Sequence, residues 1–77
     1  MSIIRVNNSR LVVYGNDHPP PHAHALGAGW ELRIALTEQP SLLTVAGSPK
    51  RQEIALALLD VQQHLTALRD FWKEYHG

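Results

Sequence analysis

Three consecutive prolines, Pro19, Pro20 and Pro21, constrain the fold of this chain more than any other feature. Proline fixes φ and has no backbone N–H, so this segment can be neither a helix nor a central strand. The segment is therefore a connection, either extended like polyproline II or turned tightly through a cis bond. The sequence leaves open which of the three prolines, if any, is cis.

The residues on both sides of the prolines predict β-strands. Ile3–Val6 and Arg10–Tyr14 are β-prone runs around an Asn-rich turn, which predicts a hairpin. A second hairpin is predicted from an extended run at His22–Leu26, a glycine-rich turn, and the run Trp30–Leu36, whose apolar residues alternate onto one face. Leu42–Val45 predicts one more short strand.

The C-terminal segment predicts one long helix over residues 48–77, with Ser48 as the N-cap and Pro49 at the first helical position. Apolar residues with alternating spacings of four and three form one stripe along this helix. They are Ile54, Leu58, Val61, Leu65, Leu68, Trp72 and Tyr75. A straight helix over residues 49–76 would be about 40 Å long, whereas a globule of this size has a radius of gyration of about 11 Å. We therefore expect the helix to overhang the sheet, bend or break.

These patterns predict a single α+β domain over residues 1–77. Residues 1–47 would form a small, mostly antiparallel sheet of four to five strands with two hairpins, and the helix would pack across one face. A domain of this size has a thin margin of stability. The chain has no cysteine, which excludes disulfides and thiolate metal sites.

The charge balance argues against general attraction to polyanions. Seven Lys and Arg residues are matched by seven Asp and Glu residues, so neither nucleic acid nor an anionic membrane is indicated as a partner. No stretch approaches the roughly 20 apolar residues of a membrane span, and the first residues lack a secretory signal. We therefore expect a cytoplasmic protein with no membrane partner.

Three of the five histidines gather around the prolines: His18, His22 and His24. His22 and His24 are two residues apart in an expected strand, so their side chains point to the same face and can reach one ion. We expect this face to be the one opposite the helix, or the edge of the sheet. Together with Asp17 the histidines form a nitrogen and oxygen ligand set that suits zinc, nickel, iron or copper. The sequence thus predicts a divalent metal site, with zinc or nickel foremost, and Glu31 in the neighbouring strand as a weaker ligand candidate.

Two other interpretations of the cluster stay open. His22 and His24 could be the catalytic acid and base of a metal-independent ribonuclease, since histidine gives and takes protons near neutral pH. In this interpretation the two histidines lie near Arg5, Arg10 or Arg33, activate a 2′-hydroxyl of RNA and protonate the leaving oxygen. Alternatively, the proline loop is a rigid turn that packs histidine rings and serves as a docking surface for a partner protein.

The end of the predicted helix suggests a further interface. Trp72 and Tyr75 continue the apolar stripe, so this part of the helix could pack on a second copy and form a homodimer. His76, next to the end of the chain, is expected to be frayed and solvent-exposed.

The order of these motifs resembles a known family. A strand ends in Tyr14-Gly15-Asn16-Asp17, the motif His18-Pro19-Pro20-Pro21-His22-Ala23-His24 and a Gly-rich turn follow, and Trp72 lies close to the C-terminal end. In this order the chain resembles, from end to end, the small bacterial "domain of unknown function" family number 4160.

The resemblance implies candidate site residues and a partner, but no established activity. Genes of this family often lie beside another small uncharacterised gene, and some are labelled as toxin–antitoxin components. The resemblance therefore implies a small protein partner encoded nearby, and the ribonuclease interpretation would correspond to an endoribonuclease toxin. Members often have valine where this chain has Ala23 and Ala25, which predicts a tightly packed inner face or a weaker strand. The site positions carried over are Asp17, His18, His22 and His24.

Overall fold

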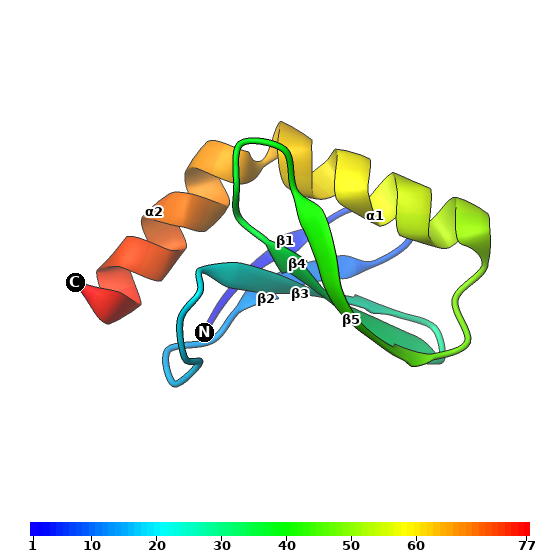
Figure 1. The fold of residues 1–77 in the computed structure, drawn as a ribbon, viewed down its shortest axis with the longest axis horizontal. Coiled ribbons are helices and arrows are strands. Elements are labelled where there is room, and N and C mark those ends of the chain that lie inside the picture. Colours follow the sequence, from blue (N-terminus) through cyan, green and yellow to red (C-terminus); the bar gives the residue numbers. More distant parts are fainter.

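The computed structural model describes residues 1–77 and has the expected α+β architecture. Five strands form one antiparallel sheet in the order β1-β2-β3-β4-β5, and two helices follow them (Figure 1). The strands are β1 (Ser2–Arg5), β2 (Arg10–Val13), β3 (His22–Gly27), β4 (Trp30–Ala35) and β5 (Ser41–Gly47). The helices are α1 (Arg51–Gln63) and α2 (Leu65–His76).

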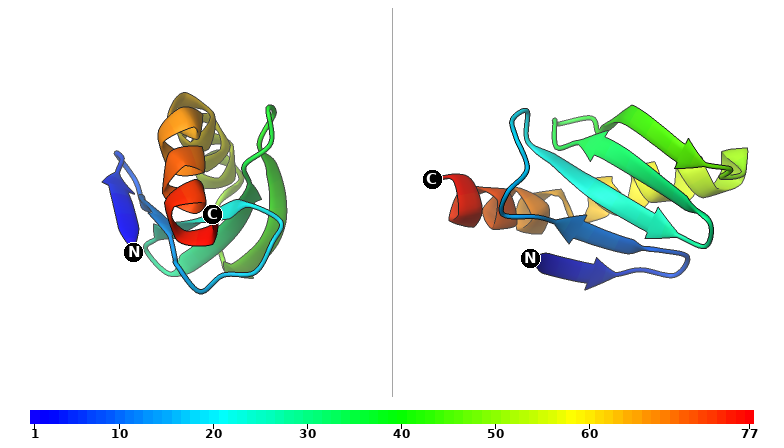
Figure 2. Two further views of the ribbon diagram at one scale, coloured as in Figure 1. Left: turned by 90° about the vertical axis from the view of Figure 1, so that its left-hand side faces the viewer. Right: turned by 90° about the horizontal axis from the view of Figure 1, so that it is seen from below.

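Both helices cover the same face of the sheet, and the other face carries no helix (Figure 2). The core lies between the two layers. The alternation predicted for β4 is confirmed, because Trp30, Leu32 and Ile34 are only 6%, 0% and 0% exposed on the helix-covered face. From the helices, Ala57, Val61, Leu68 and Trp72 complete this core.

The two alanines of β3 make the inner face tight, as their small size predicts. Ala23 lies opposite Ile34 and Ala25 opposite Leu32, and neither alanine is accessible to solvent. Since side chains alternate along a strand, His22 and His24 point to the face opposite the helix layer. This agrees with the expectation from the sequence.

The C-terminal segment is helical as expected, but it forms two helices rather than one. The chain breaks at His64, which has φ −108° and ψ 18°. A straight helix over residues 51–76 would be about 39 Å long, longer than the 35 Å maximum dimension of the molecule. The break lets α2 change direction and keep its apolar stripe on the sheet.

The prediction that Ser48 caps the helix is wrong. The Ser48 N–H donates to the Gly29 carbonyl at 3.5 Å and so prolongs the β4–β5 ladder. The helix therefore begins only at Arg51. Glu53 then fixes the helix start: its carboxylate accepts the Lys50 N–H at 2.8 Å and the Trp30 indole N–H at 3.0 Å. Neither helix has the length and apolar character needed to cross a membrane.

Candidate metal centre

The connection between β2 and β3 brings the predicted site residues to one end of the sheet. It contains a cis peptide bond between Pro19 and Pro20. After this turn the chain enters β3 at His22, and the preceding Asp17 lies back against the same strand.

Asp17, His22 and His24 converge on one point. Their ligand atoms all lie within 4.8 Å of one another. Asp17 Oδ2 is 2.8 Å from His24 Nε2 and 3.3 Å from His22 Nε2. The two histidine side chains are 5% and 8% exposed, and the Asp17 side chain is 20% exposed. The structure thus brings together three of the residues that the sequence nominated.

The orientation of both rings is fixed through their other nitrogens. His22 Nδ1 donates to the Pro20 carbonyl at 2.8 Å, and His24 Nδ1 donates to Glu31 Oε2 at 2.7 Å. Histidines that bind metals commonly donate this second N–H to a carbonyl or a carboxylate, while the remaining nitrogen faces the ion. His22 Nε2 is buried and has no hydrogen-bond partner, although Asp17 lies beside it. Glu31 therefore orients the His24 ring and lies outside the three-residue cluster.

Aromatic rings pack around the two histidines. Tyr14 meets the His24 ring edge-on, with a centroid separation of 4.8 Å. Trp72 of α2 reaches the His22 ring at 5.4 Å. These contacts exclude water from the inner side of the cluster and hold the rings in place.

His76 is a site-supporting residue that the sequence did not reveal, and the expectation that it is frayed is wrong. Its ring stacks on Trp72 at 3.7 Å with an interplanar angle of 10°. His76 Nε2 donates to the Asp17 carbonyl at 2.7 Å, so the end of α2 holds the loop that carries Asp17. The one local signal was the four-residue spacing of Trp72 and His76, which stacks side chains on a helix.

His18 is exposed and lies outside the three-residue cluster. It lines a cleft of about 350 Å³ that opens beside the cluster. Arg33, which is directly opposite His24 in the β3–β4 ladder, borders the same cleft. The other lining residues are Asn16, Asp17, Pro19, Pro20, His22, Leu43 and Thr44.

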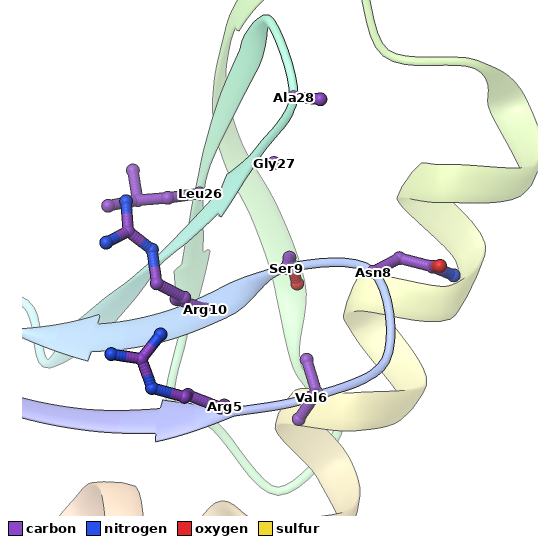
Figure 3. A pocket seen from close by; sticks show the side chains of 8 residues that line it. All are labelled: Arg5, Val6, Asn8, Ser9, Arg10, Leu26, Gly27 and Ala28. Carbon is purple, nitrogen blue, oxygen red and sulfur yellow. The ribbon is translucent and has the colours of Figure 1, made fainter.

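Arg5 and Arg10 lie in a different place. They are directly opposite each other on β1 and β2, and they line a separate shallow cleft with Leu26 and the two adjoining turns (Figure 3). Neither arginine forms an ion pair with a carboxylate. All ion pairs of the structure involve His22 or His24. Of the three arginines that the ribonuclease interpretation invoked, Arg33 alone borders the histidine cleft.

No family model, no curated protein and no solved structure matches this chain. The resemblance to family 4160 therefore stays a prediction, and the site has to be interpreted from its own geometry.

Proposed function

We propose that Asp17, His22 and His24 bind one divalent transition-metal ion, and that the protein is a small metal-binding module. The observation that carries this proposal is His22 Nε2, a buried nitrogen without a hydrogen-bond partner that lies beside a carboxylate. An unsatisfied buried polar group costs about 1–3 kcal/mol. A metal ion would give this nitrogen a partner and would use the lone pair that it presents.

Two of the three distances between the ligand atoms support this proposal, and the third pair, His22 and His24, lies within 4.8 Å. In a tetrahedral site with bonds of about 2.0–2.1 Å, two ligand atoms are roughly 3.3 Å apart. Asp17 Oδ2 and His22 Nε2 are 3.3 Å apart, and Asp17 Oδ2 and His24 Nε2 need to separate only slightly from 2.8 Å. Zinc and nickel are the first ions to test, because two imidazoles and one carboxylate suit both.

Three protein ligands leave a coordination position free, as in metal sites that bind an exchangeable ligand. The cleft beside the cluster gives access to this position, and the guanidinium of Arg33 borders it. A small anion is therefore the ligand class that the site favours.

The metal-independent ribonuclease has less support. Both Nδ1 atoms already donate to protein acceptors, so each ring could exchange protons with a substrate only through a buried Nε2. The partner encoded nearby and the homodimer through the C-terminal helix remain proposals. Trp72 is only 7% exposed within its own chain, which leaves little of its ring for a second copy.

Calorimetric titration of the metal-free protein with Zn²⁺ and Ni²⁺ tests the proposal. We expect one ion per chain, and we expect His22→Ala, His24→Ala and Asp17→Asn each to weaken binding at least 100-fold. His64→Ala is the matched control, because His64 lies between the two helices and away from the site. Unchanged affinity in the three site variants would refute the metal site.

Two further measurements separate the alternatives. Histidine side-chain NMR signals should shift on metal addition at His22 and His24 and stay unchanged at His64. Growth arrest on expression that His22→Ala relieves and a chelator does not affect would instead support the ribonuclease.

A further inference from the structure

Strand β5 is an exposed edge of the sheet, with a β-bulge at Leu43 and regular pairing to β4 from Thr44 to Gly47. All seven of its residues, Ser41–Gly47, are exposed, and the strand contains no charged residue and no proline. Leu42, Leu43 and Val45 are 38%, 45% and 48% exposed. The opposite edge, β1, has only four residues. Natural sheets usually protect such edges with charges, prolines or covering elements, because a free edge pairs readily with another strand.

The hydrogen-bonding pattern identifies which backbone groups of β5 are free. In an antiparallel ladder the hydrogen-bonded pairs alternate with pairs that are not hydrogen-bonded. Ser48 is hydrogen-bonded to Gly29. Ala46 and Thr44, which lie two and four residues before Ser48, are therefore also hydrogen-bonded to β4. Between them, the N–H and C=O of Val45 point away from the sheet.

Exposed leucines also lie on α1, and one of them borders the segment that leads into this edge. Leu56 and Leu59 are 39% and 53% exposed, and Leu59 lines a shallow cleft with Pro40, which directly precedes β5. Five of the eight large apolar side chains that are more than a third exposed belong to β5 and α1. Exposed apolar side chains therefore lie on both the sheet layer and the helix layer of the fold.

We propose that a second copy of this chain pairs with β5, antiparallel and about a two-fold axis near Ala46 in the regular part of the strand, to form one continuous sheet. A two-fold axis places the same surface on both sides of the interface. An uncharged strand can face itself without placing like charges directly opposite each other, which would be destabilising.

This arrangement bears on the candidate metal centre. Leu43 and Thr44 form one wall of the cleft that His18 and Arg33 border. A partner strand on β5 would extend that wall. The two clefts would open on the same face of the joint sheet, because a two-fold axis perpendicular to a sheet keeps each face on its own side.

Sedimentation equilibrium of the metal-free chain tests this inference. We expect a mass of about 17 kDa, twice the 8.6 kDa of the chain. Val45→Pro removes an outward-facing donor at an edge, where proline is tolerated, and should weaken the dimer at least 100-fold. Ile3→Pro is the matched control: Val6 is bonded to Ser9, so the Ile3 N–H also points outward, but on β1.

An introduced thiol gives a test that does not depend on proline. The chain has no cysteine, so Ala46→Cys provides a single thiol at the proposed axis. We expect a disulfide-linked dimer on mild oxidation, and none from Ile3→Cys.

A parent mass of 8.6 kDa would overturn the proposal. So would a Val45→Pro variant that keeps both the dimer and the near-UV circular dichroism of Trp30 and Trp72. Because the protein is metal-free in these experiments, neither result bears on the metal site.

Discussion

Each ring nitrogen of His24 lies next to a carboxylate, and these two carboxylates determine which hydrogen bonds or metal contacts the ring can make. Asp17 Oδ2 lies 2.8 Å from Nε2, and Glu31 Oε2 lies 2.7 Å from Nδ1. Without an ion, the ring can donate to both carboxylates only when both nitrogens are protonated. With an ion at Nε2, Asp17 becomes a second ligand, and Glu31 keeps the ring oriented and its nitrogen basic.

Glu31→Gln tests this supporting role. We expect metal affinity to fall by about 10–100-fold, the usual effect of losing a partner of a metal-binding histidine. Calorimetric titration measures the change, with Glu38→Gln in the β4–β5 connection as the control. Unchanged affinity would mean that Glu31 does not act through His24.

A pH dependence of folding is expected at Glu53. Hydrogen bonds from the Lys50 backbone N–H, and then from the Trp30 indole, hold the pKa of Glu53 below its ordinary value of 4.5. A carboxyl with a lowered pKa stabilises the fold above its unfolded pKa, and this contribution is lost as the pH falls through the folded value. We therefore expect the melting temperature of the parent to exceed that of Glu53→Gln at pH 7, and the difference to shrink from pH 4.5 to pH 3. A constant difference across this range would contradict the assignment.

At the scale of the elements, the β1–β2 pair carries an unfavourable contact. Arg5 and Arg10 are directly opposite each other in the ladder, and like charges in this position are destabilising. Their guanidinium groups form no ion pairs that would offset the repulsion.

Arg10→Glu would convert this contact into an attractive pair. We expect the free energy of unfolding to rise by about 0.2–1 kcal/mol, measured by urea denaturation at low ionic strength. The gain should shrink in 0.5 M NaCl, where exposed charges are screened. Arg10→Thr should give a smaller gain that depends less on salt, and a loss of stability in both variants would argue against repulsion at this position.

The contact between the two layers depends on the small residues of β3. Ala25→Leu would add three carbon atoms where no solvent-accessible space exists, so we expect a loss of about 1–3 kcal/mol from overpacking. Thr66→Leu, at an exposed position of α2, should change stability by less than about 0.5 kcal/mol. Equal effects of the two substitutions, measured by urea denaturation, would show that the inner face of β3 can adapt.

At the scale of the whole molecule, the features that depend on neighbouring residues could be predicted from the sequence. The features that depend on contacts between distant residues could not. Period-two alternation in β4 and the apolar stripe on the helices follow from neighbouring residues, so the α+β class could be derived from the sequence. The length of the helical segment predicted that the helix would overhang, bend or break, but not that the break falls at His64, and the late helix start depends on the Gly29–Ser48 bond. No local pattern contains that information.

The same distinction between local patterns and distant contacts applies to the candidate site. Asp17, His22 and His24 could be named from their spacing, whereas the spacing did not show that His18 is exposed and lies outside the cluster. His76 was missed because its partner lies 59 positions earlier in the chain.

The hydrogen bond between His76 and the Asp17 carbonyl makes the arrangement of the three proposed ligands depend on the folding of the whole chain. The end of α2 holds the loop of Asp17 where the three proposed ligands come together, so an unfolded chain would have no comparable affinity for an ion at this site. Binding and folding are then thermodynamically linked, and free metal at 100 times its dissociation constant would add about 2.7 kcal/mol to stability. In a chain without cysteine the ion would serve as a reversible cross-link, comparable in size to a disulfide at about 2–4 kcal/mol. The amount of folded protein would then follow the supply of metal.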